Sequence, residues 1–286
     1  METVDDQMDR VVEATVSAET DGIQPGGFLL ELSPDWIVRR ASENIHHLLG
    51  ESHVTLIDEP LGRFVHGQAL HDLRNLFARL SGTTGIARAY AVRLTDDPDL
   101  VDIAFQLVGS RVLLEAVPSA GAFGEHFGTV GGLIDGLAGS RGHALLEGAA
   151  RRMRALTGHD RVTLVCGDER AESSRGTFNA PANMSADIPA IIADAEAPFV
   201  PIFPRTQDSV SEQALLRSPG AEILEPIARL GIRSSMRATF KVDKMHGEFR
   251  CGSRMPRPPS LELHAAAELF AQMFALRLEL AHRADG

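Results

Sequence analysis

The chain has 286 residues, 44% of them hydrophobic, and a formal net charge of −11. Its length allows two domains, each with its own core. The acidic balance argues against nucleic acid as a partner, because clustered Lys and Arg bind its phosphates. No apolar run is long enough to span a membrane, and the acidic N-terminus lacks the apolar segment of a secretory signal. Cys166 and Cys251 are too few for a disulfide scaffold, so we expect a cytoplasmic protein.

The first half of the chain alternates between strand-like and helix-like patterns. Apolar residues recur at spacings of three and four over residues 67–80, which predicts an amphipathic helix. The other predicted elements are strands at 28–32, 36–40, 86–94, 100–108 and 111–117, and a short helix that Ser42 caps and Gly50 ends. Small residues over 118–124 mark a domain boundary.

The second half repeats this alternation. The predicted helices are 127–137, 144–156, 224–230 and a last one that Ser260 caps and that runs to Leu280. The predicted strands are 161–165, 177–180, 232–242 and 247–251. Residues 182–219 carry several prolines and no regular period, so we expect a long loop there.

A short motif, Gly22-Ile23-Gln24-Pro25-Gly26-Gly27, precedes the first predicted strand. It resembles the Ile-Gln-Pro-His-Gly run that opens the PAS domain of bacterial phytochromes. Four later segments agree with that family: Ala41-Ser42-Glu43-Asn44, Leu48-Leu49-Gly50, Gly158-His159-Asp160-Arg161-Val162 and Ala186-Asp187-Ile188-Pro189. The resemblance is to the PAS–GAF sensory module of bacteriophytochromes and extends over about residues 22–280.

The resemblance implies an α+β fold of two domains, each a central antiparallel sheet with flanking helices. The implied parts are an N-terminal extension at 1–21, a PAS domain at 22–118, a linker at 119–126 and a GAF domain with a C-terminal helix at 127–286. In this family the segment before the PAS domain passes through a loop of the GAF domain and forms a knot, which most folds lack. Ile23 would lie inside the loop, and residues 199–217 would encircle it.

Several residues that would hold a bilin are missing from the matching positions. Bacterial phytochromes attach biliverdin through a Cys upstream of the Ile-Gln-Pro run, since the addition to a vinyl group needs a nucleophilic thiol. The matching position lies at or near Val12, and no Cys precedes Cys166. The family's pyrrole-contacting His falls at Ile223, and a nearby Tyr falls at Pro226. The sequence therefore predicts no covalent attachment.

Further losses fall on the walls of the same implied pocket. Two aromatic residues of the family are replaced by Val165 and Gly167, and a His near the last strand becomes Gly252 or Ser253. An Arg that binds a bilin propionate is deleted after Pro189. The candidate cofactor-binding residues that remain in this vestigial pocket are Asp187, Ile188, Pro189, Arg217, Ser234 and Ser235.

Ordinary structural roles compete with these assignments. Residues 187–189 could form a packed loop, and Arg217 could make a surface ion pair of little consequence. The histidines between residues 46 and 71 fit no metal-ligand spacing, and the glycines of 128–139 lack the ending of a phosphate-binding loop. We therefore predict no metal site, no catalytic residue and no enzymatic activity.

Two hypotheses for the function remain open. In the first, the chain is a phytochrome-like signal-transduction protein with a degenerate pocket and no cofactor, which binds another signalling protein such as a kinase or a regulator and lacks its own output domain. The alternative is a photoreceptor that binds biliverdin non-covalently. We also expect a homodimer through 127–137 and the last helix, which has more apolar residues than one packing stripe needs. The predicted interface residues are Phe270, Met273, Phe274 and Leu280.

Overall fold

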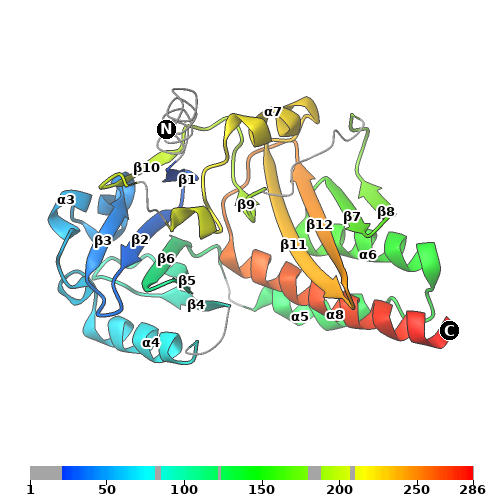
Figure 1. The fold of residues 1–286 in the computed structure, drawn as a ribbon, viewed down its shortest axis with the longest axis horizontal. Helices are drawn as coiled ribbons and strands as arrows, with labels where there is room; N and C mark the ends of the chain where they lie inside the picture. The colour runs from blue at the N-terminus through cyan, green and yellow to red at the C-terminus, as the bar shows by residue number, and fades with distance from the viewer. Residues whose placement is uncertain (1–20, 81–84, 122–123, 180–187, 207–209, 286) are drawn as a thin grey trace, which may run out of the picture. The chain divides into compact units, whose positions relative to one another are not determined.

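The computed structural model describes residues 21–80, 85–121, 124–179, 188–206 and 210–285 (Figure 1). The chain divides into two compact units. The first unit consists of Met1–Ser119 with Ala197–Gly220, and the second of Ala120–Glu196 with Ala221–Gly286. The domain division by sequence placed residues 197–220 in the second domain. The structure corrects this, because the segment adds a strand to the sheet of the first unit.

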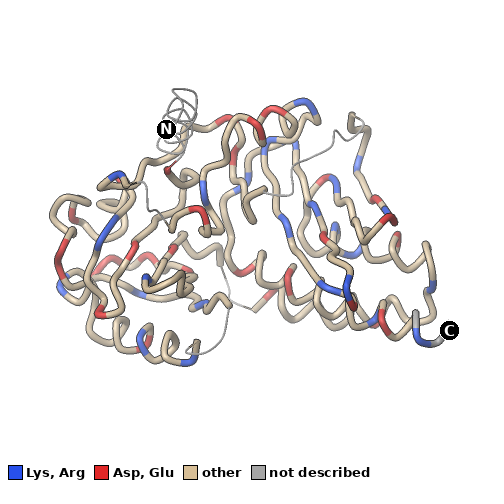
Figure 2. The backbone as a smooth tube through the Cα atoms, viewed as in Figure 1, with Lys and Arg blue, Asp and Glu red and all other residues tan. Residues whose placement is uncertain are grey.

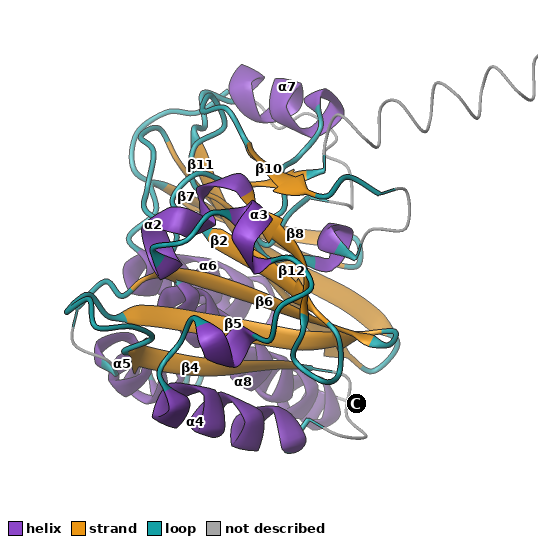
Figure 3. Cartoon of the chain, turned by 90° about the vertical axis from the view of Figure 1, so that its left-hand side faces the viewer, coloured by secondary structure: helices purple, strands orange, loops and turns teal. Residues whose placement is uncertain are grey.

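A seven-stranded sheet forms the centre of the first unit, in the order β1-β10-β3-β2-β6-β5-β4. All neighbouring strands are antiparallel. The strands are β1 (Gly22–Ile23), β2 (Phe28–Leu32), β3 (Val38–Ser42), β4 (Ile86–Val92), β5 (Val101–Val108), β6 (Arg111–Pro118) and β10 (Val200–Phe203). The α-helices are α2 (His46–Leu49), α3 (His53–Leu56) and α4 (Gly67–Ala78), of which α4 packs beside β4 (Figure 3).

The core of the first unit forms where the apolar face of α4 meets the sheet. Leu70 and Leu73 of α4 are buried there, as the spacing of three and four predicts. The ring of Phe77 meets Trp36 edge-on at 5.9 Å between centroids and lies 6.1 Å from the ring of Phe105. Aromatic contacts of this kind add to the area that the helix buries.

A five-stranded antiparallel sheet forms the centre of the second unit, in the order β8-β7-β12-β11-β9. The strands are β7 (Arg161–Cys166), β8 (Glu169–Ser174), β9 (Ile191–Ile192), β11 (Ser234–Val242) and β12 (Met245–Ser253). The α-helices are α5 (Glu125–Asp135), α6 (Gly142–Thr157), α7 (Ala221–Arg229) and α8 (Leu261–Asp285). Helices α6 and α8 cover one face of this sheet, and α5 packs against these two helices (Figure 1).

Four phenylalanines fill the space between α8 and the sheet of the second unit. Phe240 and Phe249 come from β11 and β12, Phe270 and Phe274 come from α8, and their ring centroids lie 5.4–5.8 Å apart. Phe270 and Phe274 are completely buried. Their prediction as interface residues is therefore wrong, because they form the core of one unit.

Other sequence predictions also differ from the structure. Residues 177–179, predicted as part of a strand, have no regular secondary structure. Ser42 ends β3 and stands at the N-cap position of the 3-10 helix Glu43–Ile45, but its hydroxyl makes no capping hydrogen bond and instead accepts the N–H of Leu29 at 3.1 Å. The long stretch predicted as a loop contains β9 and β10. Each of these strands pairs with a segment that is distant in sequence, so a local pattern gives no sign of it.

Ile23 lies between two parts of the segment 197–220. It pairs with Val200 on one side and forms an isolated bridge with Arg217 on the other. Beside it, the N–H of Gln24 donates to Leu216 O and the N–H of Ser218 donates to Gly22 O, both at 2.8 Å. Ile23 is completely buried. These contacts agree with the expected position of Ile23, whereas the knotted path stays a prediction, because residues 207–209 lie outside the described part of the chain.

Candidate functional site

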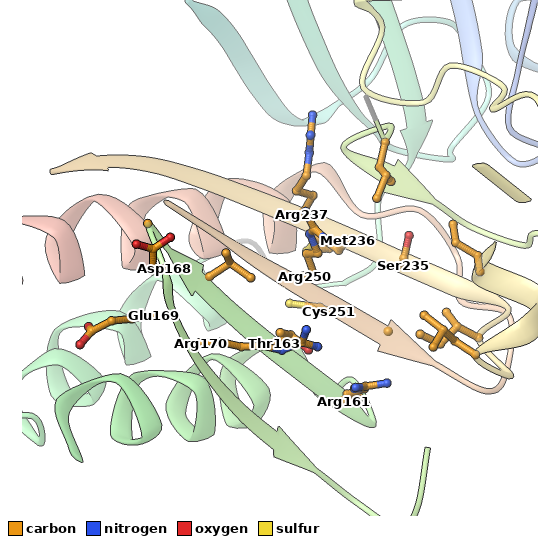
Figure 4. A pocket seen from close by; sticks show the side chains of 17 residues that line it. Arg161, Thr163, Asp168, Glu169, Arg170, Ser235, Met236, Arg237, Arg250 and Cys251 are labelled. Carbon is orange, nitrogen blue, oxygen red and sulfur yellow. The ribbon is translucent and has the colours of Figure 1, made fainter. Parts of the chain in front are cut away.

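A cavity of about 380 Å³ opens on the second unit, on the face of its sheet opposite to α8 (Figure 4). Alternation along the strands creates its floor, since successive side chains of a strand point to opposite faces. On β7, Val162 and Leu164 enter the core, while Arg161, Thr163 and Val165 line the cavity. The floor from β11 and β12 is Ser235, Arg237, Arg250 and Gly252, joined at the core boundary by Met236 and Cys251.

Aliphatic side chains form one end of the cavity. Ile188, Ile227, Leu230 and Ile232 line it, and they belong to a buried cluster with Ile192 and Ile223. Ile227 and Ile223 lie one helical turn apart on α7, so both face the sheet.

At this end of the cavity, the side chain of Ile232 packs directly on Gly252 of the floor. A Cβ atom on this glycine would lie 2.7 Å from Cδ1 of Ile232, which is too close for a real contact. Ile232 therefore occupies the space that a side chain at position 252 would need.

Charged side chains line the rest of the cavity: Arg161, Arg170, Arg237 and Arg250, together with Asp168 and Glu169. Figure 2 marks the basic positions along β11 and β12. Arg250 donates to Glu248 through two nitrogens, Nε at 2.6 Å, and Arg237 lies 3.9 Å from the other oxygen of Glu248. Arg161 is 5% exposed; it donates to Glu172 at 2.7 Å and to the backbone oxygen of Asn179 at 3.3 Å.

Two buried polar atoms of the lining have no hydrogen-bond partner among the described residues. One is Nε of Arg161 and the other is Oγ of Ser235. A buried donor without a partner costs roughly 1–3 kcal/mol. Such atoms usually contact an ordered water or a ligand, so this cavity is the candidate binding site.

The structure separates the residues that the sequence analysis assigned to one pocket. Ile188 and Ser235 line the cavity, and Pro189 is buried next to Ile188. Ser234 points elsewhere and donates to Met255 O at 2.8 Å. Arg217 belongs to the first unit, where its backbone bridges to Ile23. Asp187 lies outside the described residues.

Sequence reasoning missed the arginines of the floor. Arg237 and Arg250 alternate with buried apolar residues on β11 and β12, a pattern that is also typical of a solvated strand face. Arg161 belonged to a motif that served only to support the family resemblance. The positions Val165, Gly167 and Gly252, which were expected on the pocket walls, all line the cavity.

The two thiols and the nearby histidine are poorly suited to chemistry. Burial raises the pKa of the Cys251 thiol to about 12, and burial with Glu169 nearby raises the pKa of Cys166. Both thiols stay protonated at neutral pH and are weak nucleophiles. Burial, aided by Arg257, lowers the pKa of His159 to about 3, so its ring is neutral.

Within the residues that the structure covers, no three His, Cys, Asp or Glu side chains are grouped as metal ligands would be. None of the helices in that part of the chain combines the length and the apolar character needed to cross a bilayer.

Comparisons with known proteins agree with the two-unit architecture. A family model described as a PAS fold matches residues 18–116. No curated protein sequence matches the chain. The structure of bacteriophytochrome RpBphP3 from the photosynthetic bacterium R. palustris matches with a TM-score of 0.77 and 22% identity over 93% of this chain. This chain covers 59% of that protein's length.

Two isolated chromophore-binding domains match over nearly their whole length. The domain of the R. palustris protein gives a TM-score of 0.74 and 23% identity, covering 93% of this chain and 98% of the domain. The domain of the Stigmatella aurantiaca phytochrome P1 gives 0.71 and 23%, covering 91% and 95%. At this identity the similarity shows the fold alone: a PAS unit and a GAF unit, as the sequence predicted. We use these names for the first and second units below.

Proposed function

We propose that this chain is a phytochrome-like sensory module of signal transduction that carries no covalently attached bilin and acts in the cytoplasm by binding another signalling protein. The main support is the lining of the GAF cavity. Its described lining residues include no aromatic side chain, and its one cysteine, Cys251, has a pKa of about 12. A thiol of that kind does not add to a vinyl group at neutral pH.

The aliphatic end of the cavity supports the same proposal. Ile223, in place of the family's His, is 4% exposed and packs within the isoleucine cluster. An aliphatic side chain offers no hydrogen bond to a pyrrole nitrogen. Ile232 covers Gly252, one of the two positions at which a second His of the family is replaced. Both substitutions remove polar groups and fill space that a ligand would use.

A second function is favoured by one observation. Arg161, Arg237 and Arg250 line the same cavity, and guanidinium groups bind carboxylates well. A bilin has two propionates, so non-covalent binding of biliverdin is the alternative proposal. In that case the chain would be a photoreceptor.

We propose that the homodimer surface lies on α8. Leu269, Leu276 and Leu280 are 38%, 62% and 59% exposed, and the half-buried Met273 falls between them. Their spacing of four, three and four places these residues on one stripe, as in a coiled-coil seam. We propose that a second copy covers this stripe and forms a homodimer.

Addition of biliverdin to the purified protein tests the main proposal. We expect no zinc-dependent fluorescent band on a denaturing gel and no reversible red/far-red difference spectrum. A fluorescent band would show a thioether and contradict the proposal. A stoichiometric red-absorbing complex without that band would instead establish the non-covalent photoreceptor.

A further inference from the structure

The remaining volume of the GAF cavity limits what it can hold. At about 380 Å³ it lies near the lower end of the range of about 300–1,000 Å³ for small-molecule sites. The inference below rests on the proposed function, because it requires that no covalent bilin fills this space.

The chemistry of the lining differs along the cavity. In the register of the sheet, Arg161, Gly252 and Ser235 lie in one row across β7, β12 and β11. The aliphatic residues from α7 and the following turn cover this row, since Ile232 packs on Gly252. The next row contains Arg250, which pairs with both Thr163 and Arg237. A ligand in this space would therefore have the guanidinium groups of the floor on one side and the aliphatic residues that cover the row of Arg161 and Ser235 on the other.

The polar groups of the lining favour an acceptor. Arg161 Nε is a donor that is buried and unpartnered among the described residues, and Ser235 Oγ is a hydroxyl in the same state. Arg170, on β8, also lines the cavity and is exposed. Guanidinium groups are donors only, so an anion with several lone pairs satisfies them best.

The apolar groups of the lining restrict the rest of the ligand. Ile188, Ile227, Leu230 and Ile232 offer branched aliphatic surface without the flat ring faces on which a conjugated system stacks. A saturated chain matches such a surface through burial of methylene groups alone.

We propose that this cavity binds a small carboxylate with a saturated aliphatic body, of the size of octanoate. The carboxylate lies among the arginines of the floor, and the aliphatic body lies against the α7 end.

Isothermal titration of the full chain with sodium octanoate tests the proposal, with 1-octanol and octylamine as probes of the same length. We expect saturable binding of octanoate, and dissociation constants at least about tenfold higher for the alcohol and the amine, because neither offers a carboxylate to the arginines. The absence of saturable octanoate binding, or equal binding of the three probes, would overturn the proposal.

Matched variants locate the site. Arg250→Gln should raise the dissociation constant for octanoate about tenfold, since a charge-assisted bond is lost. Arg233→Gln is the control: Arg233 is paired with Asp194 much as Arg250 is paired with Glu248, and its exposure is similar, 34% against 28%, but it does not line the cavity. Equal weakening by the two variants would place the binding elsewhere.

Biliverdin in the same titration separates the two proposals. If octanoate fails to bind and biliverdin forms no adduct, the carboxylate proposal alone is wrong. If biliverdin forms a thioether, the proposed function is wrong whatever octanoate does.

Discussion

The PAS unit and the GAF unit each bury an arginine: Arg40 in the first and Arg161, on the cavity wall, in the second. The two arginines differ in how many of their nitrogens have a hydrogen-bond partner. Arg40, 3% exposed, uses all three nitrogens: Nε donates to Pro204 O at 2.7 Å, Nη1 lies 3.4 Å from Glu31, and Nη2 pairs with Asp21. Arg161, equally buried, has a partner for two nitrogens and none for Nε among the described residues.

This difference distinguishes buried polar groups that stabilise the fold from buried polar groups that can bind a ligand. The partners of Arg40 come from segments far apart in sequence, and Ser211 also donates to Asp21, at 2.6 Å. A fully paired network of this kind fixes how the segments cross. An incompletely paired group on a cavity wall leaves hydrogen-bonding capacity for a ligand.

The largest expected effect comes from breaking the paired cluster. Arg40→Met removes the cation that pairs with the buried Asp21 and leaves Glu31 with Arg111, and we expect a loss of about 3–5 kcal/mol in the free energy of unfolding. Urea denaturation measures it. Arg39→Met is the control, because its ion pair with Asp58 is exposed and should contribute about 0–1 kcal/mol. Equal losses in the two variants would show that the buried cluster has no special role.

A second prediction concerns Glu115, whose carboxylate accepts the N–H groups of Leu215 and Leu216 at 2.9 and 2.8 Å. Burial raises the pKa of Glu115 from 4.5 to about 7, although these two donors and Arg88 oppose the rise. The native state therefore holds the proton to higher pH than the unfolded state does. The contribution of Glu115 to the free energy of unfolding is fully present below about pH 4.5. It is lost as the pH rises through about 7, and the total loss is about 3 kcal/mol.

Glu115→Gln tests this pH dependence, because glutamine has the same shape and does not titrate. We expect the difference in unfolding free energy between the native protein and the variant to change steadily between pH 5 and 8, in the direction that favours the variant at high pH. A difference that stays constant over this range would contradict the assignment.

The smallest expected effects compare two strand serines. Ser42 is completely buried and accepts the N–H of Leu29, so Ser42→Ala should cost about 1–3 kcal/mol by leaving that donor unpaired. Ser235→Ala removes a hydroxyl without a partner among the described residues and should change stability by less than about 0.5 kcal/mol. A loss at Ser235 equal to that at Ser42 would show that its hydroxyl is already bonded in the free protein.

Local patterns predicted much of the fold. The strand Arg161–Cys166 and the helix Gly142–Thr157 were placed within a few residues, because their alternation and periodicity directly reflect which face is buried. Gly158 ends that helix with a positive φ of 65°, which explains why a glycine stands there.

The failures had a different physical origin. Strand β10 contains Pro201 and pairs with segments more than a hundred residues away, so nothing local marks it as a strand. Helix α8 is buried on most of its surface, so apolar residues occur on nearly all of its sides. Their spacing therefore does not distinguish Phe270, which lies in the core, from Leu276, which is exposed. Pocket residues were transferred by motif, and Arg217 shows that a matching segment can belong to the other unit.

The discontinuity of the PAS unit bears on how the chain is made. Because β10 and the partners of Ile23 come from Ala197–Gly220, the PAS sheet cannot be completed when its first 119 residues leave the ribosome. At a synthesis rate of about 5–20 residues per second, its N-terminal part waits several seconds for this strand. During that time the edge of β3 and the side chain of Ile23 lack their final cover. Nascent chains of this protein should therefore depend on chaperones until residue 220 emerges.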